Sequence, residues 1–282
     1  MDSEIKIPRT DEDDPRQSML NACSSGDVAT LQQLFLKHGI QPGSKPIPTK
    51  SLPPSPNAPH LGGKAIIESG IPSTDELLQR AVAAKQVGMV KFILHTYPSL
   101  TLSQSHGVVS AVLDNPSPSV LQALCDHDSN FASFSVDYCF RSFLTDACSR
   151  PPALIVPVIH VLLDNGTDVH DGWPAGYALW AAITGNQPVE IVSKILEKGG
   201  IVSSGCVVMA IRRGDADVVE ALLSSRRVSA RVEAEKCVEE SKKTGDEEII
   251  AIVQTWARKK VERDAGGSNE GSKTWGWKFW KS

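Results

Sequence analysis

The 282-residue sequence has few aromatic residues and no excess of charge of either sign. Aromatic side chains make up 6% of the chain, and the net charge is −4, from 29 basic and 33 acidic residues. This balance gives no electrostatic reason to expect DNA, RNA or an anionic membrane as the main partner. Hydrophobic residues at 41% and charged residues at 22% are ordinary for a protein with a buried core, so disorder over the whole chain is excluded.

Paired cysteines and long apolar runs are also missing. The six cysteines are scattered without a C-x-x-C spacing, which argues against a zinc module or a thioredoxin-like motif. The N-terminal segment is polar and has no apolar stretch of signal-peptide length, so we expect a cytoplasmic or nuclear protein. The longest apolar run, residues 153–163, contains Pro157 and His160 and falls short of the roughly 18 apolar residues that cross a bilayer. We therefore expect no transmembrane segment.

No linear signature of an active site is present. The sequence has no G-x-S-x-G, H-E-x-x-H or G-x-G-x-x-G motif. Residues 266–274, GGSNEGSKT, resemble a phosphate-binding loop with an extra residue before the lysine, but no predicted strand precedes them. Cys125, His127 and Asp128 could ligate a metal, yet no second cluster accompanies them and a capping turn explains them better. We expect no enzyme, cofactor or metal site; the alternative is an enzyme or small-molecule-binding protein in an atypical helical fold.

What the sequence does contain is a repeated helical pattern. In its clearest copy, residues 207–223, an apolar residue and a small pair precede the turn at Gly214, and two valines and a Leu-Leu pair follow it. Related copies place their turns at Gly26, Lys85, Pro116, residues 151–154, Gly185 and Gly245. From Lys85 onward the turns recur about every 29 to 38 residues. Each unit holds two short segments of helical period that could not bury their apolar faces alone, so the units are expected to stack.

This pattern resembles the ankyrin repeat family over about residues 18–260, outside one insertion. The residues that match best are Ala181-Ala182-x-x-Gly185-Asn186, Gly214-Asp215-x-x-Val218-Val219-x-x-Leu222-Leu223 and Leu162-Leu163-x-x-Gly166-x-Asp168-Val169. The T-P-L-H helix start of that family is absent from every copy. The resemblance implies an all-α fold, an ankyrin-type α-solenoid of about six or seven helix-pair repeats; a solenoid of another helix-pair family is the alternative.

The function that the resemblance implies is a non-catalytic scaffold or adaptor for protein–protein interaction, such as a regulatory subunit or transcriptional co-regulator. Its ligand surface in ankyrin-like repeats is the concave side, formed by hairpin tips and the last turn of each first helix. The residues that precede the turns in the C-terminal half of the chain include Arg150, Ile183, Thr184, Arg212, Arg213 and Lys243. We expect the basic members of this set to form a shallow strip for an acidic peptide of a partner; the alternative is solvated charges favoured by the helix dipole.

The repeat domain is expected at residues 18–263, after an acidic flexible tail at residues 1–17. Residues 41–73 are rich in Pro, Gly and Ser and should form a loop inserted between the first two repeats. The alternative for this loop is a proline-rich ligand, because residues 52–56, LPPSP, could adopt polyproline II.

Residues 264–282 are expected to form a flexible tail rich in Trp and Lys. Trp275, Trp277 and Trp280 lie there among lysines, a combination suited to a groove on a partner or to peripheral contact with a membrane interface. The alternatives are a disordered tail and a tail that folds back onto the repeats. We expect a monomer that binds another protein and makes no direct contact with nucleic acid.

Overall fold

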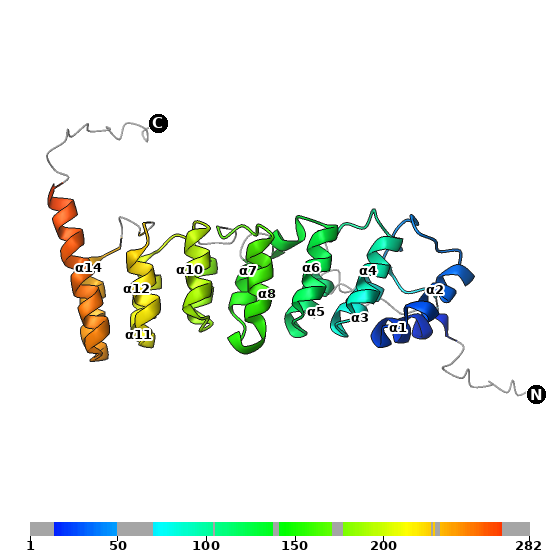
Figure 1. The fold of residues 1–282 in the computed structure, drawn as a ribbon, viewed down its shortest axis with the longest axis horizontal. Helices are drawn as coiled ribbons and strands as arrows, with labels where there is room; N and C mark the ends of the chain where they lie inside the picture. Colours follow the sequence, from blue (N-terminus) through cyan, green and yellow to red (C-terminus); the bar gives the residue numbers. More distant parts are fainter. Residues whose placement is uncertain are drawn as a thin grey trace, which may run out of the picture.

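The chain is mostly helical, which confirms the all-α prediction. The computed structural model describes residues 14–49, 70–103, 105–137, 141–170, 177–226, 228 and 232–266. Within these residues fourteen α-helices stand side by side in an elongated row, with α1 at one end and α14 at the other (Figure 1). None of the helices in the described part of the chain is both long and apolar enough to span a membrane.

The helices form two layers. One layer contains α1 (Pro15–Ser25), α3 (Thr74–Ala83), α5 (His106–Asp114), α7 (Phe143–Cys148), α9 (Tyr177–Thr184), α11 (Ser204–Arg213) and α13 (Ala234–Thr244). The other contains α2 (Val28–Lys37), α4 (Val87–Thr96), α6 (Pro118–His127), α8 (Pro152–Asp164), α10 (Val189–Glu197), α12 (Ala216–Ser224) and α14 (Glu247–Gly266). In both layers each helix contacts the next helix of the same layer, so the first and second helices of successive pairs form two parallel series.

A small non-helical element interrupts the row between α6 and α7. It consists of a 3-10 turn, η2 (Phe131–Ser133), and two antiparallel strands, β1 (Ser135–Asp137) and β2 (Arg141–Ser142). Phe131 is buried and packs edge-on against Phe143 of α7, with ring centroids 5.7 Å apart. These strands were not predicted from the helical pattern.

One apolar core runs between the layers. The second helices supply large aliphatic side chains, as Val219 and Leu222 do in α12, and both are fully buried. The first helices supply small residues where they pack against their neighbours. These small residues have at most 2% of their surface exposed: Ala81, Ala147, Cys148, Ala181, Ala182 and Ala210. Small side chains let the first helices approach one another closely, while the aliphatic residues fill the space between the layers.

Most of the predicted turns adopt the left-handed backbone conformation that ends a helix. Gly26, Gly214 and Gly245 have φ values of 75°, 71° and 70°, and Lys85 takes the same conformation with φ of 57°. Glycine adopts this region without steric cost, whereas lysine there is strained. In the turn after α9 the left-handed residue is Asn186, with φ of 61°, and not the neighbouring Gly185.

Gly185 is required for a different reason, its close approach to the preceding helix pair. A Cβ atom at this position would lie 1.9 Å from the carbonyl oxygen of Cys148 and 2.9 Å from that of Ala181. Two residues further on, Gln187 donates from Nε2 to the carbonyl oxygens of Cys148, at 2.9 Å, and Arg150, at 2.7 Å. The turn is therefore fastened to the end of α7 by direct packing and by two hydrogen bonds.

The edges of the helical region differ slightly from the expected domain boundaries. Helix α1 begins at Pro15, with the Asp14 side chain accepting from the Arg16 N–H, so it starts inside the segment expected as a tail at residues 1–17. Helix α14 continues to Gly266, beyond the expected boundary at residue 263. Residues 50–69 of the predicted loop and residues 267–282 of the predicted tail lie outside the described residues.

We predict that Gly185→Ala destabilises the fold by about 1–3 kcal/mol, since the added methyl group must push the turn away from α7. Gly88→Ala in α4 is the matched control, because a Cβ there meets nothing within 4 Å. The control should unfold at the same or a higher temperature than the wild type, since Ala favours a helix more than Gly does. Thermal and urea unfolding followed by circular dichroism measure both. Equal stability of the two variants would contradict the close approach at Gly185.

Candidate binding face

The ends of the first-layer helices and the turns after them form a continuous face, which we call the turn face. It carries Arg150 after α7, Thr184 at the end of α9, Arg212 and Arg213 at the end of α11, and Lys243 near the end of α13. Because α7, α9, α11 and α13 contact one another in that order, the turns that follow them lie in the same order along the row. The structure therefore places the predicted basic positions along one side of the molecule.

Three of the four basic residues predicted to form the strip are paired with acidic residues of neighbouring or the same helices. Arg150 lies 3.1 Å from Asp114 at the end of α5. Arg212 donates to Glu240 of α13 at 2.9 Å. Lys243 lies 2.9 Å from the other oxygen of Glu240, and also 2.8 Å from Glu239.

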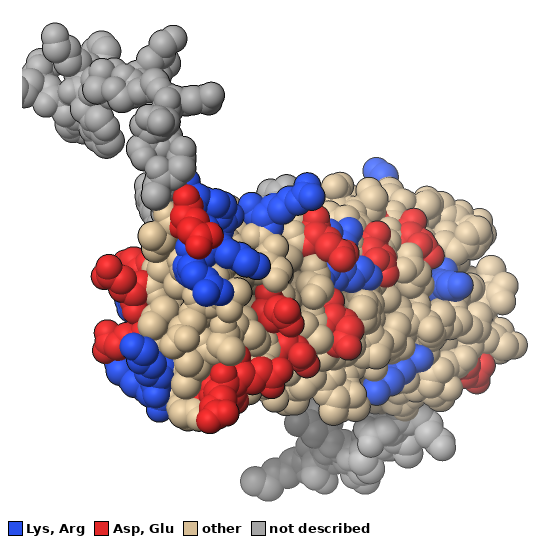
Figure 2. All heavy atoms as spheres, turned by 60° about the vertical axis from the view of Figure 1, so that its left-hand side comes forward, with Lys and Arg blue, Asp and Glu red and all other residues tan. Residues whose placement is uncertain are grey.

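Arg213 is half-buried and makes no ion pair within the described residues. The turn face is thus a series of mixed charges with one unpaired arginine. On the surface shown in Figure 2, which brings the α14 end of the row forward, acidic and basic side chains are likewise interspersed.

Glu240 is the centre of this charge cluster. Hydrogen bonds from Arg212 and Lys243 lower the pKa of Glu240 to about 2, so its carboxylate stays ionised throughout the physiological range. Reciprocally, the hydrogen bond to Glu240 raises the pKa of Arg212, and hydrogen bonds to Glu239 and Glu240 raise that of Lys243. All of these groups remain charged, and the two bases are neutralised by internal carboxylates.

Ile183 and Thr184 do not extend the basic strip. The side chain of Ile183, predicted to contact a partner, lies in the core with 2% of its surface exposed. Thr184 is exposed, and its hydroxyl donates to the carbonyl oxygens of Trp180, at 3.0 Å, or Ala181, at 3.2 Å. Helix α9 is mostly apolar and buried, so a position near its turn is not necessarily exposed.

A recess with a volume of about 370 Å³ runs between α5 and α7 and reaches the turn face at Ser149 and Arg150, and we call it the α5–α7 cleft. Its lining residues are His106, Val109, Ser110, Leu113, Val136, Arg141, Asp146, Ser149 and Arg150. The β-strands between α6 and α7 supply two of these residues, so the non-helical insertion forms one wall. Apart from Arg150, sequence reasoning missed this cleft. The only signal was the unusually long spacing between the turns at Pro116 and residues 151–154.

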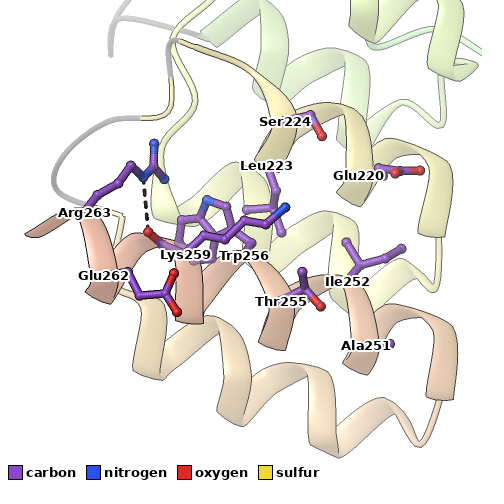
Figure 3. Close-up of a pocket in the computed structure, with 10 residues that line it drawn as sticks. All are labelled: Glu220, Leu223, Ser224, Ala251, Ile252, Thr255, Trp256, Lys259, Glu262 and Arg263. Atoms are coloured by element: carbon purple, nitrogen blue, oxygen red, sulfur yellow. Dashed lines mark hydrogen bonds between the residues drawn. The ribbon is translucent and has the colours of Figure 1, made fainter.

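A second recess lies between α12 and α14, and we call it the terminal groove (Figure 3). Its volume is about 920 Å³. The residues that line it are Glu220, Leu223 and Ser224 of α12 and Ala251, Ile252, Thr255, Trp256, Lys259, Glu262 and Arg263 of α14. The residues Trp275, Trp277 and Trp280, predicted to contact a partner, lie outside the described residues.

The cysteines in the described part of the chain are not suited to nucleophilic chemistry. Cys23, Cys125, Cys148, Cys206 and Cys237 are buried and unpaired. Burial raises the pKa of Cys23 and Cys125 to about 12 and that of Cys237 to about 11, and it raises that of Cys148 as well. Thiols with such pKa values are protonated at neutral pH, and the thiolate is the reactive form.

Of the three residues considered as metal ligands, His127 and Asp128 fasten a loop and Cys125 is buried in the core. Asp128 accepts from the backbone N–H groups of Leu102, at 3.1 Å, and Asn130, at 3.0 Å. His127 Nε2 lies 2.9 Å from the carbonyl oxygen of Leu100. No group of three or more His, Cys, Asp or Glu side chains suited to a metal ion occurs among the residues that the structure describes.

We predict that the five buried thiols react slowly with a thiol reagent such as 5,5′-dithiobis(2-nitrobenzoate) at pH 8. The reason is that burial blocks the reagent from all five thiols, and the raised pKa suppresses the thiolate of Cys23, Cys125, Cys148 and Cys237. The variant Cys139→Ser leaves only these five thiols. The native variant should release almost no chromophore, whereas the variant unfolded in about 6 M guanidinium chloride should react at once. Rapid labelling of native Cys148 would contradict the packing of α7 against α9.

Comparisons with known proteins give no relative for this chain. None of the models of known protein families matches the sequence. A search of curated proteins gives no significant match. The assignment of a function therefore depends on the physical features described above.

Proposed function

We propose that the chain is a non-catalytic protein-interaction scaffold, built as an ankyrin-like solenoid, that binds a segment of another protein on its turn face. The observation that carries this proposal is the serial contact of helix pairs, in which each helix packs against the next one of its own layer. Such a row leaves the ends of all its first helices available along one side. Repeat proteins use extended surfaces of this kind to bind partners.

The recurrence of the turn geometry supports the ankyrin-like assignment. Left-handed residues follow the first helices at positions 26, 85, 186, 214 and 245. After positions 26, 85 and 214 the next residue is the N-cap of the second helix. Asp27 and Asp215 cap their helices by accepting from the backbone N–H three residues later. The Gly-Asp pairs of the sequence thus act in equivalent ways in the first and sixth helix pairs.

The partner that fits the turn face is an acidic peptide segment. Arg213 has no ion pair among the described residues, Arg212 adjoins it in sequence, and Lys243 binds the same carboxylate, Glu240, as Arg212. Because the latter two already bind Glu240, the carboxylates of a partner must compete with an internal carboxylate. We expect binding that weakens as salt is added, since exposed charges are screened within about 8–10 Å at physiological ionic strength.

The second candidate is a small-molecule site in the α5–α7 cleft. Its volume of about 370 Å³ lies near the lower limit for ligand pockets, and His106, Asp146 and Arg150 bring titratable groups to its walls. An enzyme or small-molecule-binding protein would use such a recess. A scaffold would use the whole turn face, of which the cleft is one part. The proposal includes a monomeric state and a location in the cytoplasm or nucleus.

We predict that Glu240→Gln increases the affinity of the chain for a labelled oligoglutamate peptide by about three- to tenfold at low salt. The substitution removes the carboxylate that neutralises Arg212 and Lys243. Glu235→Gln is the matched control, because it changes the net charge equally from an exposed position on the same helix. Fluorescence anisotropy measures the affinities. Equal effects of the two substitutions would show that only net charge matters and would reject the strip as a site.

The partner-binding role itself is tested by reversing charge on the turn face. We expect Arg212→Glu with Arg213→Glu to reduce the capture of native partners by at least tenfold, as measured by affinity capture from native cells and quantitative mass spectrometry. Lys91→Glu with Arg258→Glu is the control, since these exposed residues lie on second-layer helices. Circular dichroism checks that both variants fold. Undiminished capture by the turn-face variant would rule out this face as the binding surface.

A further inference from the structure

We infer that the terminal groove between α12 and α14 is the docking site of the chain's own aromatic segment at residues 273–281. This segment contains Trp275, Trp277, Phe279 and Trp280 together with three lysines. The inference is independent of the turn face, because the groove lies between two second-layer helices and shares no residue with that face.

The groove has an apolar floor and a polar rim. Leu223 and Trp256 form the floor with 7% of their surface exposed, and the half-buried Ile252 continues it along α14. Glu220 stands on the rim contributed by α12, and Glu262 on the rim contributed by α14. Figure 3 shows these residues projecting from the two helices on opposite sides of the groove. An apolar channel with carboxylates on its edges suits aromatic side chains interleaved with lysines.

The groove arises from the mismatch in length between its two helices. Helix α14 has 20 residues and α12 has 9. At 1.5 Å per residue their lengths are about 30 Å and 14 Å, so α14 extends beyond its neighbour. No helix pair follows α14 in the described part of the chain, and its protruding half keeps apolar surface such as Val261, which is 62% exposed.

The aromatic segment is tethered within easy reach of the groove. Arg263, at one end of the groove, precedes Gly266, the last described residue, by three positions. The groove runs back along α14 to Ala251, a distance of about 18 Å for twelve helical residues. Trp275 follows Gly266 by nine residues, which span up to about 30 Å when extended. The segment can therefore turn back and reach any position along the groove.

The tether also makes docking within the same molecule favourable over binding to other molecules. A segment on a short linker has an effective concentration in the millimolar range at its own site. Four aromatic side chains gain free energy by leaving water, and each buries a large apolar area. The lysines in the segment can then approach Glu220 on α12, whereas Lys259 and Arg263 beside Glu262 disfavour their placement at that end of the rim. We assign the aromatic side chains to the floor near Leu223 and Ile252.

The first experiment compares an occupied groove with an empty one in the full chain. The variant Trp275→Ser, Trp277→Ser, Trp280→Ser leaves the groove without its occupant. A fluorescent synthetic peptide of residues 267–282 should bind this variant, and should bind the wild-type chain at least about tenfold more weakly because the tethered segment competes. Anisotropy at equal protein concentrations gives both affinities. Failure of the peptide to bind the triple variant, or equal binding to both chains, would overturn the inference.

The second experiment locates the binding site. In the triple-Trp variant, Thr255→Arg places a long charged side chain in the groove, and we expect it to reduce peptide binding at least tenfold. Gln254→Arg is the matched control, because this neighbouring residue is exposed on the same helix but does not line the groove. Thermal unfolding confirms that both variants fold. Equal binding by the two variants would place the peptide elsewhere and reject the groove.

Two further measurements test the alternatives, which are docking of the segment in a second copy of the chain and binding of the segment to a membrane. Sedimentation of the wild-type chain should show no concentration-dependent dimer; a dimer lost in Thr255→Arg would show docking between two copies and contradict docking within one. Binding to phosphatidylserine-containing vesicles should be stronger for the Thr255→Arg chain with native tryptophans than for the wild type, because the segment is released. Equal and strong vesicle binding would show that the segment is not held by the groove. None of these outcomes depends on Arg212 or Arg213, so they are independent of the test of the turn face.

Discussion

The close approach of neighbouring helix pairs is the constraint on which the rest of the structure depends. The helices before α14 have 6 to 13 residues, too short to be stable alone in water. They are stable because each pair packs against the next through small residues, and because hydrogen bonds join neighbouring pairs. Gly185 touches the carbonyl oxygen of Cys148, and Gln187 donates two hydrogen bonds to the end of α7. Between the first two helix pairs, Gln86 Nε2 donates a similar hydrogen bond to the carbonyl oxygen of Ser24, at 3.3 Å.

This mode of assembly separates the residues that stabilise the row from those on its exposed ends. The core residues lie between the layers, while the ion pairs of Arg150, Arg212 and Lys243 lie on the turn face. Exposed ion pairs contribute little to stability, because water and salt screen them. Their carboxylates can therefore be exchanged for those of a partner at little cost to the fold. Such a surface is free to change its charge contacts while the packing beneath it stays intact.

The features that local sequence determines were the ones that could be predicted. Glycine followed by aspartate specifies a left-handed residue and a helix cap, so the turns at Gly26 and Gly214 were located correctly. In Gly185-Asn186 both residues tolerate the left-handed region, and only the contact with Cys148 determines which of them adopts it. The burial of Ile183 and the two strands at residues 135–137 and 141–142 likewise depend on tertiary packing.

The neutralisation of the basic strip could not be read from any single repeat. Arg212 pairs with Glu240, which lies 28 residues away in the next repeat, and Arg150 pairs with Asp114 of the preceding one. A linear pattern compares each position with its equivalents in other repeats, whereas these contacts join different positions of adjacent repeats.

The last described helix pair, α13 and α14, has a neighbouring pair on one side only. Helix α13 suits a terminal position, since its buried residues are few and Ser241 and Lys242 replace the small pair of the inner repeats. Helix α14 does not suit it equally, because it is twice as long as α12, lines the terminal groove with Ile252 and Trp256, and exposes Val261 on its protruding half. Helix α13 is thus polar enough to face water, whereas α14 keeps an apolar surface. A row stabilised by neighbour contacts gains most from a further contact at this helix, and the terminal groove is where that contact would form.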